Sequence, residues 1–186
     1  KLANNSEGTI TEAKRIWASI DRPNIMIKVP GTEGGANAIR TLIGLGINVN
    51  VTLLFSVEAY RRSANAYLEG LNDYLNSGGT SVSKIASVAS FFVSRIDTAI
   101  DSKLTEPSLK GKAGITNAWN AYKLFTELFD ISPRGNFNAL SKKGAQFQRP
   151  LWASTSVKNP NYPETMYVDQ LMGPRTVNTV PENTFF

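Results

Sequence analysis

The chain has 186 residues, of which 41% are hydrophobic and 19% charged, values typical of a globular domain with a core of its own. It contains no cysteine and no histidine, which excludes disulfide bonds, histidine acid–base catalysis and metal sites built on either residue. The net charge of +5 comes from scattered positive residues, and the sequence has no apolar run long enough for a membrane span. We therefore expect no nucleic-acid partner and no membrane partner.

The beginning of the chain predicts a helix, a strand and a second helix. Residues 9–19 carry apolar side chains at helical spacing, with Thr9 or Thr11 as the capping residue. The apolar run over residues 25–29 is short, rich in β-branched side chains and closed by Pro and Gly, which predicts a buried strand. The glycine pair at 34–35 is more typical of a helix entry than of a phosphate-binding loop.

The rest of the chain repeats this alternation. Further strands are expected over residues 47–56, 87–93 and 151–155. Helices are expected over residues 57–76, 97–104, 112–129 and 165–171, with Ser56 capping the first, and residues 130–148 are irregular or hold one short helix. We expect the three tryptophans, Trp17, Trp119 and Trp152, in the core. Strands alternating with helices predict a parallel sheet, and no linker divides the chain, so we expect one domain over residues 1–186.

Lys28 is the residue most clearly suited to catalysis, because it is a single amine within the first apolar run. Lysine is rarely buried without a reason. In an apolar pocket the charged form of an amine is disfavoured, so it can attack a carbonyl carbon and form a Schiff base. Alternatively, Lys28 pairs with a carboxylate or reaches solvent from the strand end.

Four motifs, in order along the chain, resemble the transaldolase family. They are IKVPGT at residues 27–32, NVTLLFS at 50–56, ASVASFFVSRID at 86–97 and WASTSVKNP at 152–160. The resemblance is nearest to the branch found in bacteria, cyanobacteria and plastids. It implies an α/β fold, the (β/α)8 TIM barrel of class I aldolases, with Lys28 as the Schiff-base lysine. It also implies transfer of a dihydroxyacetone unit between sugar phosphates in the pentose phosphate pathway, without metal or organic cofactor, in the cytoplasm or in a plastid.

The length suggests that the barrel is incomplete, because a full (β/α)8 barrel needs at least roughly 200 residues. Residues 1–3 resemble the loop after the third strand of the family, and residues 176–181 resemble the eighth strand. We therefore expect about five of the eight parallel strands, a domain truncated at both ends, and no proton-transfer carboxylates of the family. Such a chain would be inactive by itself, and its open sheet edges could pair between copies into a homo-oligomer. Alternatively, the chain is a natural half-barrel.

The resemblance implies three substrate-binding residues on the strands. Asn50 and Thr52 lie two positions apart, so in a strand they share one face, where they would bind substrate hydroxyls or a catalytic water. Ser90 would bind the substrate's oxygens. Alternatively, Asn50 and Thr52 bond to one another, and Ser90 fills interior space because of its size.

The resemblance also implies a phosphate-binding group. Arg95 would hold the substrate phosphate, which its planar guanidinium suits. Ser154 and Lys158 would help, although many relatives carry an arginine where this chain has Lys158. Alternatively, Arg95 is a surface residue that pairs with Asp97.

The implied substrates are fructose 6-phosphate, sedoheptulose 7-phosphate, erythrose 4-phosphate and glyceraldehyde 3-phosphate. Two other functions remain open from the sequence. One is a related Schiff-base fructose 6-phosphate aldolase, which releases free dihydroxyacetone. The other is an inactive barrel fragment with an interaction role.

Overall fold

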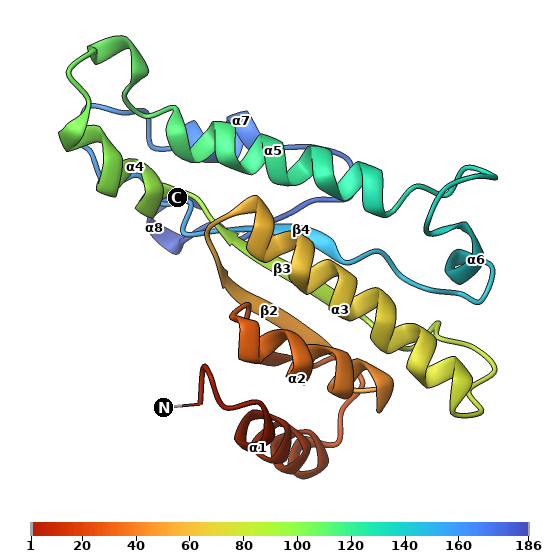
Figure 1. The fold of residues 1–186 in the computed structure, drawn as a ribbon. Helices are drawn as coiled ribbons and strands as arrows, with labels where there is room; N and C mark the ends of the chain where they lie inside the picture. Colours follow the sequence, from red (N-terminus) through yellow and green to blue (C-terminus); the bar gives the residue numbers. More distant parts are fainter. Residues whose placement is uncertain (1, 186) are drawn as a thin grey trace.

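The computed structural model describes residues 2–185 and contains one open sheet of five strands (Figure 1). The strands are β1 (Ile27–Pro30), β2 (Val49–Leu54), β3 (Ser87–Phe92), β4 (Arg149–Ala153) and β5 (Val177–Asn178). Each strand pairs in parallel with the strand that follows it in the sequence. This order confirms the expected α/β class and agrees with an incomplete barrel, because consecutive strands of a (β/α)8 barrel are neighbours.

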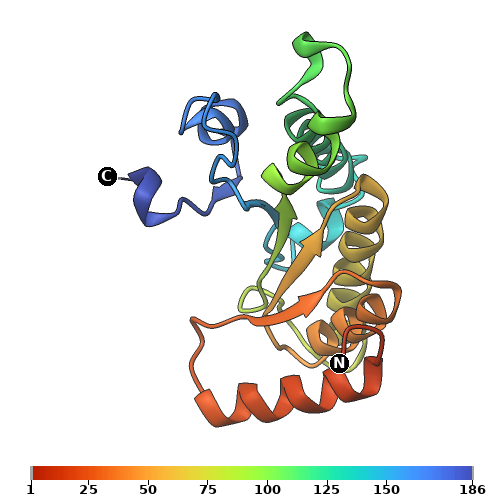
Figure 2. The same ribbon diagram turned by 90° about the vertical axis from the view of Figure 1, so that its left-hand side faces the viewer.

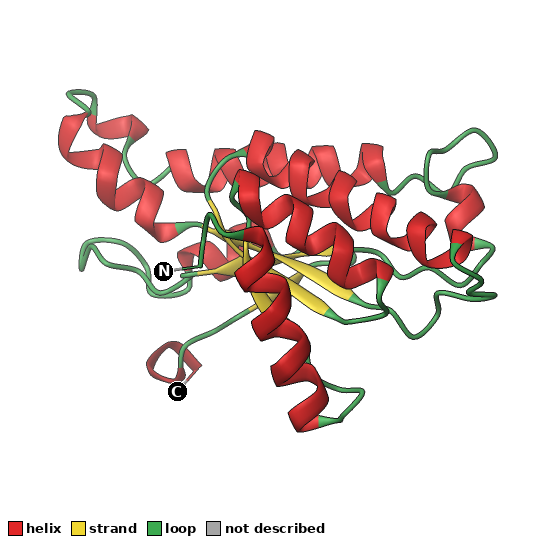
Figure 3. Cartoon of the chain, turned by 60° about the horizontal axis from the view of Figure 1, so that its bottom comes forward, coloured by secondary structure: helices red, strands yellow, loops and turns green. Residues whose placement is uncertain are grey.

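Helices occupy the connections and lie mainly on one side of the sheet. They are α1 (Ser6–Ile20), α2 (Glu33–Gly44), α3 (Val57–Asn76), α4 (Ser94–Ile100), α5 (Ala113–Leu128), α6 (Asn138–Ser141), α7 (Met166–Leu171) and α8 (Glu182–Phe185). Figure 2 shows α2, α3 and α5 layered against one face of the strands, while the C-terminal stretch extends away from the other. Figure 3 shows helices packed beside the strands and the C-terminal stretch apart from them. Within residues 2–185, none of the helices combines the length and apolar character that a bilayer crossing requires.

The main core fills the space between these helices and the sheet. Alternate residues of each strand point into it, as the two-residue period of a strand requires. The strand residues buried there include Ile27, Val29, Val49, Val51, Ala89, Phe91 and Trp152. From α3, Tyr60, Ala64, Tyr67 and Leu71 meet them at helical spacing. This face of the sheet therefore supplies most of the apolar burial that holds the fold together.

The opposite face of the sheet, which we call the open face, carries a smaller apolar cluster. Val88, Leu151 and Ala153 are buried there, with Phe92 and Val177 packed against them. These residues alternate with the core residues of the same strands. The two clusters are therefore separated by the sheet itself, and the residues on the open face include those to which the sequence assigns chemistry.

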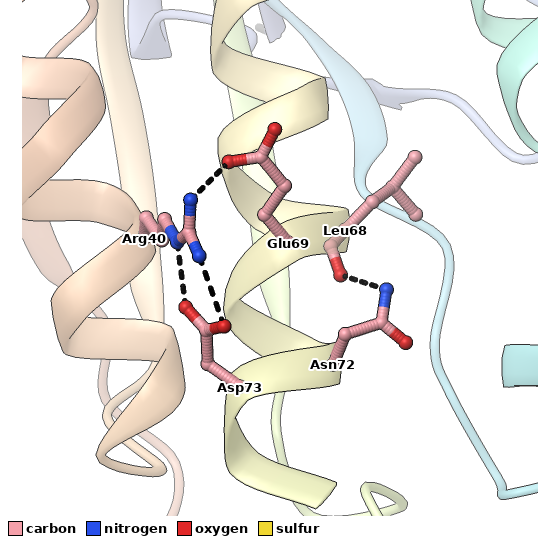
Figure 4. A network of polar contacts seen from close by, with 5 residues as sticks. All are labelled: Arg40, Leu68, Glu69, Asn72 and Asp73. Atoms are coloured by element: carbon pink, nitrogen blue, oxygen red, sulfur yellow. Dashed lines mark hydrogen bonds and ion pairs between the residues drawn. The ribbon is translucent and has the colours of Figure 1, made fainter. Parts of the chain in front are cut away.

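Helices α2 and α3 are joined by close packing and by an exposed ion-pair network (Figure 4). Gly70 permits the close approach, since a Cβ atom there would lie 2.7 Å from the Arg40 carbonyl oxygen. The Arg40 guanidinium donates two hydrogen bonds to Asp73, at 2.6 and 3.0 Å, and one to Glu69 at 2.8 Å. Exposed ion pairs contribute little stability, so packing dominates this contact. The contact fixes the strands that precede the two helices, β1 and β2.

Several predicted boundaries are confirmed, and other predictions are wrong. Ser56 caps α3, as predicted, by accepting the Ala59 amide at 3.2 Å. Helix α1 begins before the predicted start because Asn5 caps it through the Gly8 amide. Helix α4 begins at Ser94, directly after β3, rather than at residue 97. Trp119 is 53% exposed and does not belong to the core.

Candidate active site

Three predicted site residues form a row across the open face of neighbouring strands. Lys28 on β1 pairs in register with Asn50 on β2. The Ser90 hydroxyl on β3 donates to Asn50 Oδ1 at 2.7 Å. Ser90 is 3% exposed and Asn50 is half-buried. The row places an amine, an amide and a hydroxyl side by side, and the carboxamide oxygen of Asn50 is engaged by Ser90 rather than by Thr52.

The Lys28 side chain is exposed. The expectation of an apolar pocket around it is therefore wrong within residues 2–185, the part of the chain that the structure describes. Its neighbours Ile27 and Val29 are buried, as predicted, because they face the helices. Lys28 points to the other side of the strand, and β1 is the first strand of a sheet that does not close. A buried strand thus carries an exposed amine, since only one of its faces is covered.

Strand β2 is distorted directly after Asn50. The register with β3 shifts between Val51 and Leu54, and Leu53 has a left-handed backbone with φ of 59°. Such a conformation costs a non-glycine residue on the order of 1–3 kcal/mol. Bulges of this kind occur near active sites, where they redirect side chains. Thr52, half-buried next to the bulge, pairs in register with Pro30 at the end of β1, so it lies further along the strands than the Lys28–Asn50 pair.

The ends of β3 and β4 bring together two further predicted residues and one that the prediction missed. The hydroxyls of Ser94 and Ser154 lie 3.0 Å apart, and the Ser94 amide donates to the Ser154 carbonyl at 3.0 Å. Arg95 is exposed, and its guanidinium carbon lies 4.9 Å from the centre of the Phe92 ring on the open face. Ser94 belongs to the third motif, and its place directly after a strand was the signal for it.

Arg95 does not pair with Asp97, the alternative that the sequence left open. The Asp97 carboxylate is 1% exposed and accepts hydrogen bonds from the Gly114 amide and the Tyr167 hydroxyl, both at 2.8 Å. Arg95 has no ion pair among residues 2–185. Its guanidinium can therefore accept an anionic group from outside, which is the chemistry that a phosphate site needs.

Lys158 lines a different hollow from Ser154. Its amine donates to the Ser156 hydroxyl at 2.6 Å. It lines a hollow of about 340 Å³ together with Asp97, Asp101, Tyr162 and Tyr167, beside the second half of α4 and the turn that follows it. Ser154 instead lines a separate hollow with Thr179 and Pro181. The structure brings Ser154 and Arg95 to the ends of adjacent strands, and Lys158 lines the other hollow while bonding to Ser156, which lines the hollow of Ser154.

The sequence prediction also missed the residues that line this hollow with Lys158, namely Asp97, Asp101, Tyr162 and Tyr167. Asp97 and Asp101 are four residues apart, which places both carboxylates on the same side of the helical segment. That spacing, in a segment directly after a strand, could have identified them. In the part of the chain that the structure describes, no three or more acidic side chains gather in a way that could hold a metal ion.

Comparison with known proteins adds the family. The family model described as transaldolase/fructose-6-phosphate aldolase matches residues 1–186. A transaldolase of Saccharopolyspora erythraea is 50% identical over 190 residues, which cover all of this chain and 51% of the relative. A transaldolase of Mycobacterium tuberculosis is 49% identical over 190 residues, covering 99% of this chain and 50% of the relative. The chain spans about half the length of these relatives, and it belongs to the transaldolase/fructose-6-phosphate aldolase family.

Proposed function

We propose that the protein is a transaldolase that moves a dihydroxyacetone unit between sugar phosphates through a Schiff base on Lys28. The row formed by Lys28, Asn50 and Ser90 carries this proposal, because it sets an amine beside hydrogen-bonding groups on one sheet face. The motif match over the whole chain supports it. The two relatives named transaldolase, whose sequences are 50% and 49% identical to this chain, support the same reaction class.

In the proposed mechanism, the amine of Lys28 attacks the keto carbon of fructose 6-phosphate or sedoheptulose 7-phosphate. Loss of water gives an imine, which withdraws electrons and allows the adjacent carbon–carbon bond to break. An aldose phosphate leaves, and the three-carbon unit stays on Lys28 as an enamine until it attacks the aldehyde of an acceptor. Asn50 and Ser90 orient the hydroxyls of the bound unit, and Thr52 binds the substrate or a water further along the strands.

Arg95 anchors the substrate phosphate in this scheme, with Ser154 beside it. Arg95 lies over the open face and has no carboxylate partner among the described residues, so its guanidinium can pair with a phosphate in two parallel hydrogen bonds. A phosphate held at the end of β3 would fix which sugar carbon reaches Lys28 on β1. Fructose 6-phosphate, sedoheptulose 7-phosphate, erythrose 4-phosphate and glyceraldehyde 3-phosphate are the proposed substrates.

Imine formation and bond cleavage also need a positioned acid and base. Asn50 and Ser90 supply hydrogen bonds, but an amide and a hydroxyl are poor proton carriers near neutral pH. We therefore propose that the 186 residues by themselves do not catalyse transfer. Measurable transfer between sugar phosphates by a purified monomer of these 186 residues would contradict this.

Borohydride trapping tests the function directly. Reduction in the presence of fructose 6-phosphate should add one dihydroxyacetone-derived mass to the peptide that contains Lys28, measured in the intact protein by mass spectrometry. Lys28→Arg should abolish the adduct and leave the fold unchanged, because arginine keeps the charge but does not release its proton. Lys84→Arg, in a loop before β3, is the matched control and should trap normally. An adduct on another lysine, or none, would reject the assignment.

Two alternatives are separated by simple measurements. The family description includes fructose 6-phosphate aldolase, which would release free dihydroxyacetone from fructose 6-phosphate without an acceptor. A transaldolase would keep the three-carbon unit bound. An inactive fragment with an interaction role would show an intact mass of about 20.3 kDa in the native source, whereas a larger mass would favour the enzyme.

We place the reaction in the cytoplasm, with a plastid as the alternative.

A further inference from the structure

Two tyrosine–aspartate hydrogen bonds join helix α4 and the 3-10 turn directly after it, Asp101–Lys103, to the chain that follows β4. The Tyr162 hydroxyl donates to Asp101 Oδ2 at 2.8 Å. The Tyr167 hydroxyl donates to Asp97 Oδ2, also at 2.8 Å. Hydrogen bonds to a carboxylate are stronger than those between neutral groups, and burial strengthens them further. We call these four residues the clamp.

Each carboxylate of the clamp also holds the segment that leads into α5. Asp97 Oδ1 accepts the Gly114 amide at 2.8 Å, and Asp101 accepts the Gly111 amide at 3.0 Å. At Gly114 a Cβ atom would lie 2.7 Å from the Val93 carbonyl oxygen and 3.0 Å from Asp97 Oδ2, so a side chain does not fit. Three segments that are distant in sequence therefore meet at two carboxylates.

The tyrosines of the clamp stay protonated over the neutral range, so they remain donors. Burial, followed by the hydrogen bond to Asp97, raises the pKa of the Tyr167 hydroxyl. Burial and the hydrogen bond to Asp101 raise the pKa of the Tyr162 hydroxyl in the same way. Each hydroxyl therefore keeps the proton that its carboxylate partner needs.

The clamp bonds to the chain on the C-terminal side of the segment that carries predicted phosphate-binding residues. Ser154 is fixed to the start of α4 through Ser94, and Tyr162 is fixed to the end of the same helical segment through Asp101. Lys158 lies between these two attachment points and lines the same hollow as the clamp. Without the Tyr162 attachment, the next bond to α4 is that of Tyr167, so the free stretch after Ser154 would lengthen and residues 155–161 would sample more conformations.

We propose that Asp97, Asp101, Tyr162 and Tyr167 are positioning residues that hold Arg95, Ser154 and Lys158 in place for the substrate phosphate. The inference rests on the proposed function. The clamp residues themselves do not touch substrate. They act by fixing α4 against the chain after β4, so their removal should weaken phosphate binding while leaving the chemistry at Lys28 intact.

Tyr162→Phe tests the proposal with the smallest change, because it removes one hydroxyl and keeps the ring. Tyr122→Phe is the matched control: Tyr122 is also half-buried, and its hydroxyl donates to the Pro174 carbonyl at 3.2 Å, away from the clamp. In the intact protein, Tyr162→Phe should raise KM for fructose 6-phosphate about 10-fold with kcat changed less than about twofold. Turnover of unphosphorylated fructose should be unchanged, and Tyr122→Phe should change neither.

A readout independent of activity completes the test. Amide hydrogen exchange over residues 155–161 should be faster in Tyr162→Phe and unchanged in Tyr122→Phe. Equal losses with phosphorylated and unphosphorylated sugar, or identical behaviour of the two variants, would overturn the proposal. If no imine forms at Lys28 in the intact protein, the proposed function fails. Exchange that is unaffected in Tyr162→Phe would reject the clamp separately.

Discussion

The two faces of the sheet differ in what they do, although the same five strands build both. The helix-facing side is covered by α2, α3 and α5 and is apolar from β1 to β4. The open face holds a small apolar cluster and, beside it, the row of Lys28, Asn50 and Ser90. Adjacent residues of one strand therefore serve different purposes. Stability comes mainly from one face, and the proposed chemistry is confined to the other.

Phe91 and Phe92 offer the strongest test of this comparison, because they are neighbours in β3 that point to opposite faces. Phe91 is 1% exposed in the main core, where it packs edge-on against Trp152. Phe91→Ala should lower the free energy of unfolding by about 3–5 kcal/mol. Phe92 is half-buried, and its ring centre lies 5.2 Å from that of Phe55. Phe92→Ala should lower the free energy of unfolding by only about 1 kcal/mol. Chemical denaturation measures both, and equal losses would show that the open face contributes as much as the core.

The helix-facing core also predicts a loss of stability at alkaline pH. Burial raises the pKa of the Tyr60 and Tyr67 hydroxyls on α3 well above the ordinary value of about 10. Their contribution is fully present below that value and falls as pH rises toward the folded-state pKa, because only the unfolded chain ionises them. The slope should reach about 1.4 kcal/mol per pH unit for each tyrosine. Tyr67→Phe should reduce the slope, and an unchanged slope in denaturation curves above pH ~10 would show that Tyr67 ionises while folded.

Arg95→Ala tests the open face without touching the core. In the intact protein, it should lower kcat/KM for phosphorylated substrates about 30- to 150-fold, the equivalent of about 2–3 kcal/mol, because a charge-assisted contact is lost. Unphosphorylated analogues should be nearly unaffected in kcat/KM. Arg22→Ala, in the loop before β1, serves as the charge-matched control. Similar losses with both substrate classes would return Arg95 to a role in packing over Phe92.

Leu53→Gly should have the smallest effect on stability and the most informative effect on the site. Leu53 is 48% exposed and has a left-handed backbone, so glycine relieves strain while little apolar contact is lost. We expect the free energy of unfolding to change by less than about 1 kcal/mol. Substrate turnover should fall severalfold, because a flexible residue at the bulge holds the neighbouring Thr52 less firmly. A clear loss of stability would mean that Leu53 supports the fold through its side chain.

The order of the strands and helices followed from the sequence because their signals are local. The Ser56 cap and the long apolar face of α3 predicted that helix from its first residue to its last. The early start of α1 was missed because Asn5 precedes the apolar pattern by several residues. Trp119 was assigned to the core on residue type alone. Its indole nitrogen instead donates to the Gln170 carbonyl at 3.1 Å, in an exposed part of the structure.

What the sequence determined by itself is the set of residues on each strand face, because the two-residue period of a strand fixes that alternation. Lys28 was predicted because it is a single amine in an apolar run, Asn50 because it shares a strand face with Thr52, and Ser90 because of the family motifs. Tertiary structure alone decided which face is covered, and hence that Lys28 is exposed in a sheet that does not close. It also decided that Asp97 pairs with Tyr167, 70 residues away, rather than with Arg95. Contacts over such distances depend on how whole elements pack, which no local pattern encodes.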